Sequence, residues 1–169
     1  MGGGGYPELF ADELEQNTRM REAVREVSAN GTPIYAECGG LIYLTEDLVL
    51  AAGHDNRTRD EHYTMAGVFR GGETRMPVRR VIGYVQGTAS DKSPPLGSGA
   101  FAGHEFHHTD VRLADDTEYA YRLTRGGKGI KDNLDGAVCN NTMAGYTHLH
   151  PSSVPGMFRK FTNRCRSER

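Results

Sequence analysis

TPIYAECGGLIYL, residues 32 to 44, decides the fold class of this chain. Its first six residues form a short, partly apolar run that favours a strand. The pattern from Leu41 to Leu44 suits a helix, and Cys38-Gly39-Gly40 stands between the two. A strand, a sharp turn and a helix in this order predict an α/β protein with Cys38 at the turn.

Cys38 is the first candidate for chemistry. A thiol at a strand-to-helix turn points out of the sheet and lies near helix amide dipoles, which favour the nucleophilic thiolate. Gly39 and Gly40 fit this interpretation, because a sharp elbow needs neighbours without side chains and a backbone N–H free to face an oxyanion. The alternative is a buried structural cysteine, which is a common fate of a free Cys.

Two histidines offer the base that a thiol nucleophile requires. His148 and His150 lie two residues apart in a segment predicted as a strand, so we expect both side chains on one face, where either can reach Cys38. The alternative is that both are exposed strand residues, or that one is a hydrogen-bonded core histidine.

A second dense cluster, GHEFHH, occupies residues 103 to 108. Imidazole and carboxylate groups are zinc ligands, which raises the hypothesis of a metal-binding module centred on His104 and His108. On a strand these two share a face while His107 lies on the other, so a compact site would need ligands from elsewhere. We therefore expect no metal.

Gly2 to Gly5 precede Tyr6-Pro7-Glu8, which is typical of a helix start. A glycine turn there can bind an anion or an oxyanion through its N–H groups. A flexible tail is the alternative for residues 1–3. The sequence contains no GxxxxGK[ST] loop, so we expect ATP chemistry to lie elsewhere.

The rest of the chain is predicted as one domain over residues 1–169, a length that suits a single core. Helical spacing of apolar residues predicts helices over 8–29 and 155–166. Residues 137–139 are expected to pair with 143–150 across the turn Asn140-Asn141.

Composition narrows the class of protein. A net charge of -2 without a basic cluster argues against nucleic acid as a partner. The three cysteines are far apart and indicate neither a disulfide framework nor a cysteine zinc site, which fits the reducing cytoplasm. The sequence shows neither a membrane-spanning apolar run nor a signal peptide at its start, so we expect no membrane association.

Five motifs together resemble the glutaminase domain of the a,c-diamide synthases: GGGYPE at 3–8, YAECGGLIYL at 35–44, GYV at 83–85, GHEFHH at 103–108 and HLH at 148–150. That family includes the synthases that act on cobyrinate in cobalamin synthesis and on Ni-sirohydrochlorin in coenzyme F430 synthesis. The resemblance implies an α/β fold of the class I glutamine amidotransferase type. We expect a mostly parallel sheet flanked by helices, with an added antiparallel portion.

The resemblance also implies roles for single residues. Cys38 would attack glutamine and His148 would activate the thiol. His148 is preferred to His150 because Tyr146-Thr147-His148 resembles the Tyr-x-His segment of related cobyric acid synthases. The backbone N–H groups expected to stabilise the oxyanion and bind glutamine are those of Gly4, Gly5 and Gly39. The candidate supporting residues are Glu105, His107 and His150.

The partner that the resemblance implies is an ATP-dependent synthetase domain or subunit. It would use the ammonia to amidate the a and c carboxylates of a tetrapyrrole. This chain lacks that half, with its phosphate loop and magnesium site, and also the opening strands of the glutaminase sheet. We therefore expect an N-terminally truncated fragment that binds no cofactor itself, with ATP and Mg²⁺ in the missing synthetase domain.

Two departures from the family leave alternatives open. Many triad amidotransferases place a Glu two residues after the catalytic His, where this chain has His150, so an orienting carboxylate is not evident. Truncation or substitution would also be compatible with a non-catalytic partner that only docks to a synthetase subunit.

Overall fold

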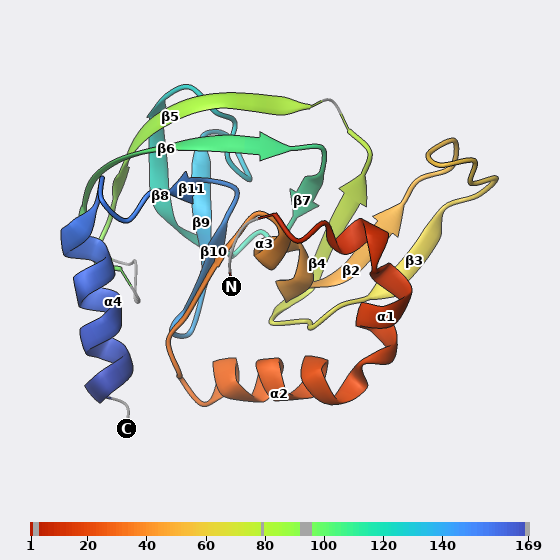
Figure 1. The fold of residues 1–169 in the computed structure, drawn as a ribbon, viewed down its shortest axis with the longest axis horizontal. Helices are drawn as coiled ribbons and strands as arrows, with labels where there is room; N and C mark the ends of the chain where they lie inside the picture. Colours follow the sequence, from red (N-terminus) through yellow and green to blue (C-terminus); the bar gives the residue numbers. More distant parts are fainter. Residues whose placement is uncertain (2–3, 79, 92–95, 168–169) are drawn as a thin grey trace.

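The computed structural model describes residues 1, 4–78, 80–91 and 96–167. In this part of the chain the strands form a seven-stranded sheet, in the order β1-β10-β9-β8-β5-β6-β11, and a four-stranded sheet, in the order β3-β2-β4-β7. The short helix α3 lies between the two sheets (Figure 1).

Most of the described strands follow one another along the chain without a helix between them. The helices are η1 (Pro7–Leu9, a 3-10 helix), α1 (Ala11–Gln16), α2 (Thr18–Ala29), α3 (Gly39–Leu44) and α4 (Pro155–Ser167). The strands are β1 (Ile34–Glu37), β2 (Thr45–Leu50), β3 (Glu61–Thr64), β4 (Phe69–Met76), β5 (Val81–Ala89), β6 (Gly99–His107), β7 (Asp110–Arg112), β8 (Glu118–Arg125), β9 (Leu134–Cys139), β10 (Thr142–Gly145) and β11 (His148–Leu149). None of the described helices has the length and apolarity needed to cross a membrane.

The predicted order of strand, turn and helix is confirmed. β1 ends at Glu37, α3 begins at Gly39, and Cys38 alone connects them. β1 pairs in parallel with β10, with Glu37 opposite Gly145. All six residues of α3 are buried, which agrees with its uniformly apolar sequence.

The prediction of a mostly parallel sheet is wrong. Among the described strands, β1 pairs in parallel with β10 and β2 with β4, whereas every other pairing is antiparallel. Parallel neighbours need a long crossover, usually a helix, and the described residues between β2 and β11 form no helix. The antiparallel portion, expected as an addition, therefore makes up most of the seven-stranded sheet.

Alternating side chains of the seven-stranded sheet enter two separate cores. Small residues face α3 and the four-stranded sheet, which lets this helix pack closely, and larger ones face α4. The small residues are Ala36, Ala137 and Ala144. The larger ones are Tyr35, Val138 and Met143. Phe158 and Phe161 of α4 close this second core with their rings edge-on to that of Tyr35.

The helix expected over residues 8–29 is interrupted, which corrects that prediction. α1 ends at Gln16, and α2 begins after Asn17, whose side-chain oxygen accepts the N–H of Met20 at 3.2 Å. This side chain competes with the helical backbone and starts a new helix, an effect that apolar spacing does not reveal. The predicted closing helix is confirmed as α4.

The hairpin across Asn140-Asn141 is confirmed, but the long strand expected over 143–150 is not. β10 stops at Gly145, and the N–H groups of Tyr146 and Thr147 turn to the fully buried carboxylate of Asp135, at 3.0 and 2.8 Å. The chain then pairs with β6 as β11. Asp135 therefore directs the segment that carries His148.

Replacing Asp135 by Ala should lower the free energy of unfolding by about 2–4 kcal/mol, because two buried N–H groups lose their acceptor. Urea denaturation measures this change. Asp115→Ala is the control, since Asp115 is exposed and forms its ion pair with the exposed Lys131, and it should leave the transition nearly unchanged. An Asp135→Ala protein that unfolds at the parent's urea concentration would contradict this role.

Candidate active site

Cys38 has a backbone conformation that few residues other than glycine adopt. Its φ is 45° and its ψ is -102°. Its N–H donates to the carbonyl of Gly145 at 2.8 Å, and its carbonyl accepts from the N–H of Ile42 at 3.0 Å. The strained residue is thus held on one side by β10 and on the other by α3. Such strain persists only where the surroundings impose it, and it is frequent at active sites.

Gly39 and Gly40, which follow Cys38, have different surroundings, so the lack of a side chain matters differently at each. A Cβ on Gly40 would lie 3.1 Å from the Cβ of Ala36, a tight approach, so the glycine favours close packing of α3 on β1. A Cβ on Gly39 would lie 3.4 Å from Pro7 and 3.5 Å from the Gly4 carbonyl, an ordinary contact distance. Packing therefore tolerates a side chain at Gly39 more readily, and this glycine borders the hollow beside Cys38.

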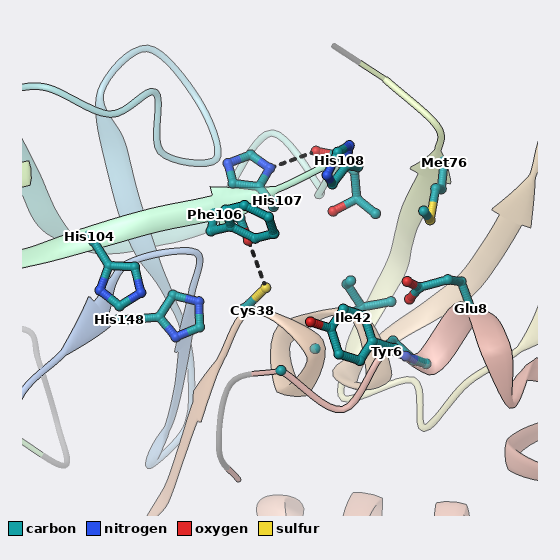
Figure 2. A pocket seen from close by; sticks show the side chains of 14 residues that line it. Tyr6, Glu8, Cys38, Ile42, Met76, His104, Phe106, His107, His108 and His148 are labelled. Carbon is teal, nitrogen blue, oxygen red and sulfur yellow. Dashed lines mark hydrogen bonds between the residues drawn. The ribbon is translucent and has the colours of Figure 1, made fainter. Parts of the chain in front are cut away.

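Cys38 and His148 line one hollow of about 200 Å³. The hollow also borders Gly4, His104 and Phe106. Figure 2 shows the imidazole of His148 beside the Cys38 sulfur, with the ring of His104 next to it. The thiol lies 3.6 Å from the carbonyl oxygen of Phe106, to which it donates. This volume suits a small substrate, since pockets for drug-sized ligands measure roughly 300–1,000 Å³.

The neighbours of His148 in the hollow strongly shift the pKa of its imidazole. Contact with the Cys38 thiol, and next with the carboxylate of Glu37, raises the pKa of His148 to about 9, although burial acts in the opposite direction. The ring is therefore protonated at neutral pH. His104 stacks on it with ring centres 4.7 Å apart, and burial and the charge of His148 lower the pKa of His104. The stacked pair thus carries one positive charge.

His150 does not share a face with His148, contrary to the sequence prediction. β11 ends at Leu149, and Pro151 follows directly after His150. Proline lacks the N–H that a continuing strand would use. The exposed His150 ring instead contacts the hydroxyl of Ser152, with Nδ1 and Oγ 2.6 Å apart. The structure thus brings His148, and not His150, to Cys38.

Glu105 and His107 point inward from β6, because side chains alternate along this strand. Glu105 accepts the N–H groups of Lys128 and Gly129 at 2.9 and 3.0 Å and does not line the hollow. Burial would raise its pKa, but His107 and these N–H groups hold the pKa of Glu105 below its usual range. Its observed contacts fix the turn after β8.

His107 borders the hollow from behind. Its Nδ1 lies 2.9 Å from the carbonyl of Thr109 and its Nε2 lies 3.4 Å from Glu105. The ring stacks on Tyr146 with centres 3.6 Å apart. Both ring nitrogens therefore already face a partner, and His107 supports the wall of the hollow.

The glycine turn before η1 reaches the hollow in part. Gly4, Gly5 and Tyr6 have φ of 82°, 66° and 44°, three consecutive left-handed residues that bend the chain back. Gly4 lines the hollow with Cys38, whereas Gly5 lines a separate apolar groove beside α2. Gly2 and Gly3 lie outside the described residues.

Sequence reasoning did not single out Glu37, a carboxylate that the structure places near His148. Its Oε2 lies 3.6 Å from Nδ1 of His148. In the triad pattern the carboxylate stands two residues after the histidine, whereas Glu37 directly precedes Cys38. Its adjacency to Cys38 was the available signal, but only the pairing of β1 and the course of β11 bring it to His148.

The hypothesis of a metal module is not supported by the geometry. Within residues 4–78, 80–91 and 96–167, no three His, Cys, Asp or Glu side chains converge in a way that would hold a metal ion. His104 instead stacks on His148, and the ring of His108 lies edge-on to Phe106.

Comparisons with known proteins agree on one kind of domain. The family model described as CobB/CobQ-like glutamine amidotransferase domain matches residues 1–155. A cobyrinate a,c-diamide synthase of Methanosarcina barkeri (strain Fusaro / DSM 804) is 47% identical over 156 residues, 88% of this chain and 31% of that protein. The synthase of the same name from Methanothermobacter thermautotrophicus is 38% identical over 161 residues, 95% of this chain and 33% of that protein. The chain thus spans about a third of the length of these relatives.

Solved structures support the fold. A glutamine amidotransferase crystal structure superposes with a TM-score of 0.52 at 17% identity, covering 98% of this chain and 77% of that one. PurLQS from Thermotoga maritima gives a TM-score of 0.57 at 10% identity, over 94% of this chain and 74% of that one. The expected α/β fold of the class I amidotransferase type is confirmed, although its sheets are mixed.

Iodoacetamide at pH 7 should alkylate Cys38 faster than Cys139, because burial raises the pKa of the Cys139 thiol while an imidazolium lies beside Cys38. In His148→Asn, alkylation of Cys38 should slow by about tenfold, since an isolated thiol is only a few per cent ionised at this pH. Mass spectrometry of tryptic peptides measures both rates. Equal rates of Cys38 alkylation in the parent and in His148→Asn would contradict the contact between Cys38 and His148.

Proposed function

Because the chain belongs to the family of CobB/CobQ-like glutamine amidotransferase domains, we propose that it hydrolyses glutamine at Cys38 and His148 and supplies the ammonia for amidation of a tetrapyrrole. The chain is the glutamine amidotransferase component of an enzyme. The observation that carries the proposal is the strained Cys38 with the protonated ring of His148 beside it. We also propose that residues 1–169 are one amidotransferase domain.

The proposed reaction begins with the Cys38 thiolate attacking the side-chain carbonyl carbon of glutamine. The positive ring of His148 stabilises the thiolate and then gives its proton to the departing nitrogen, so that ammonia leaves and a thioester remains. Water, deprotonated by the now neutral ring, attacks the thioester. Glutamate and the free thiol are released, and the net reaction consumes one water for each ammonia formed.

The tetrahedral intermediates carry a negative oxygen that requires hydrogen-bond donors. Gly39 and Gly4 border the hollow beside Cys38, so their backbone N–H groups are the proposed donors. Both positions lack a side chain that would narrow the approach. The Gly5 N–H, proposed with them from the resemblance, belongs to the same left-handed turn but lines the neighbouring groove.

The use of the ammonia is proposed from the relatives. Two relatives that are 47% identical to this chain are named cobyrinate a,c-diamide synthases and are about three times as long as the matched region. We propose that an ATP-dependent synthetase domain or subunit receives the ammonia and amidates the a and c carboxylates of cobyrinate or a Ni-sirohydrochlorin-type macrocycle, in cobalamin or coenzyme F430 synthesis. ATP and Mg²⁺ are assigned to that part, and no described residue of this chain is proposed to hold them.

The compartment proposed for this reaction is the cytoplasm. All three cysteines are free thiols, including the proposed nucleophile. A reducing environment keeps such thiols available, whereas an oxidising one favours disulfides.

Cys38→Ala should abolish glutamate release, by at least about 10³-fold, because removal of a nucleophile leaves only binding and oxyanion stabilisation. The assay is glutamate formation from glutamine by the protein together with its synthetase part. Cys165→Ala on α4 is the matched control and should behave like the parent. Parent-like glutamate release by Cys38→Ala would overturn Cys38 as the nucleophile, and no release by the parent itself would favour the non-catalytic docking role.

A further inference from the structure

We propose that Glu37 is a positioning residue for glutamine hydrolysis, an inference that rests on the proposed function. Its carboxylate faces Nδ1 of His148 and holds the imidazole with Nε2 toward the Cys38 thiol. The third member of the site is thus supplied by the residue before the nucleophile, and not by a residue that follows the histidine.

The geometry of the imidazole supports this assignment. Oε2 of Glu37 lies 3.6 Å from Nδ1 of His148, an ion-pair distance slightly longer than a hydrogen bond. A carboxylate at one ring nitrogen fixes the tautomer and leaves the other nitrogen for the reacting group. Hydrogen bonds of this kind are often long before substrate binds and shorten in the reacting complex.

The carboxylate of Glu37 is itself held in place. Its Oε1 accepts the hydroxyl of Tyr35 at 2.6 Å and the backbone N–H of Leu149 at 2.9 Å. Leu149 is the neighbour of His148 on β11. The Glu37 carboxylate therefore contacts both the backbone of this short strand and the ring of His148. The Glu37 side chain is only 14% exposed, which limits its exchange of partners with water.

The charges around the ring are consistent with this role. The groups that face His148 are the Cys38 thiol, the Glu37 carboxylate and the stacked ring of His104. Burial alone would raise the pKa of Glu37, but the bonds to His148, Tyr35 and the Leu149 N–H hold it below its usual range. Glu37 is therefore ionised at neutral pH and offsets the positive charge on His148.

The test compares three variants by glutamate release. Glu37→Gln keeps the size and the acceptor for Leu149 but removes the charge, and it should lower kcat by about 10- to 100-fold with little change in the KM for glutamine. Glu46→Gln makes the same chemical change at an exposed carboxylate that accepts the Gly71 N–H, and it should match the parent. Cys38→Ala reports on the proposed function.

The outcomes distinguish a failure of the Glu37 role from a failure of the proposed function. If Cys38→Ala is inactive while Glu37→Gln has a kcat within twofold of the parent, the role of Glu37 is overturned and the proposed function stands. If Cys38→Ala is as active as the parent, the proposed function fails first.

A second measurement does not require the Glu37→Gln protein to fold. ¹⁵N NMR of the Cys38→Ala protein, with His148 assigned by the signal lost on adding His148→Asn, reports which ring nitrogen carries the proton of the neutral imidazole. We expect the proton on Nδ1, facing Glu37. A predominant Nε2–H tautomer would overturn the proposal. Where Glu37→Gln folds, its His148 pKa should be lower than in the parent, and an unchanged pKa would also overturn it.

Discussion

The left-handed backbone of Cys38 is the constraint on which the candidate site depends. One residue turns β1 into α3, and it is held by the bond of its N–H to Gly145 and of its carbonyl to the Ile42 N–H. The first bond exists because β1 runs parallel to β10, and the second is the first i to i−4 backbone bond of α3. The thiol is therefore exposed to the hollow by the same contacts that join the two sheets.

Buried carboxylates organise the segments around this elbow. Asp135 accepts two backbone N–H groups and so directs the chain from β10 to β11, and Glu105 does the same for the turn after β8. Burial of such groups is costly unless hydrogen bonds compensate it, and both have at least two. Asp and Glu are residue types that also serve as catalytic acids, so the sequence alone does not distinguish the two roles. In the structure, each of these two carboxylates holds a turn of the backbone through its N–H groups.

The positive charge of His148 lies beside the Cys38 thiol in the hollow. His148 lies between the Cys38 thiol and the Glu37 carboxylate, while the stacked His104 has its pKa lowered by burial and by this charge. The arrangement concentrates one cation at the thiol and places a balancing anion behind the ring. Because Glu37 and Cys38 are consecutive residues, the end of β1 positions both the carboxylate and the thiol on either side of His148.

The sequence by itself determined the elements whose signals are local: the strand, elbow and helix of residues 32–44, the turn at Asn140-Asn141, and the closing helix. It also singled out Cys38 and His148 as candidates. It could not determine the partners of the strands, the break at Asn17 or the different surroundings of His148 and His150. Only the tertiary structure decided these and placed Glu37 behind His148, because strand pairing, capping and the burial of a carboxylate depend on residues far apart in the chain.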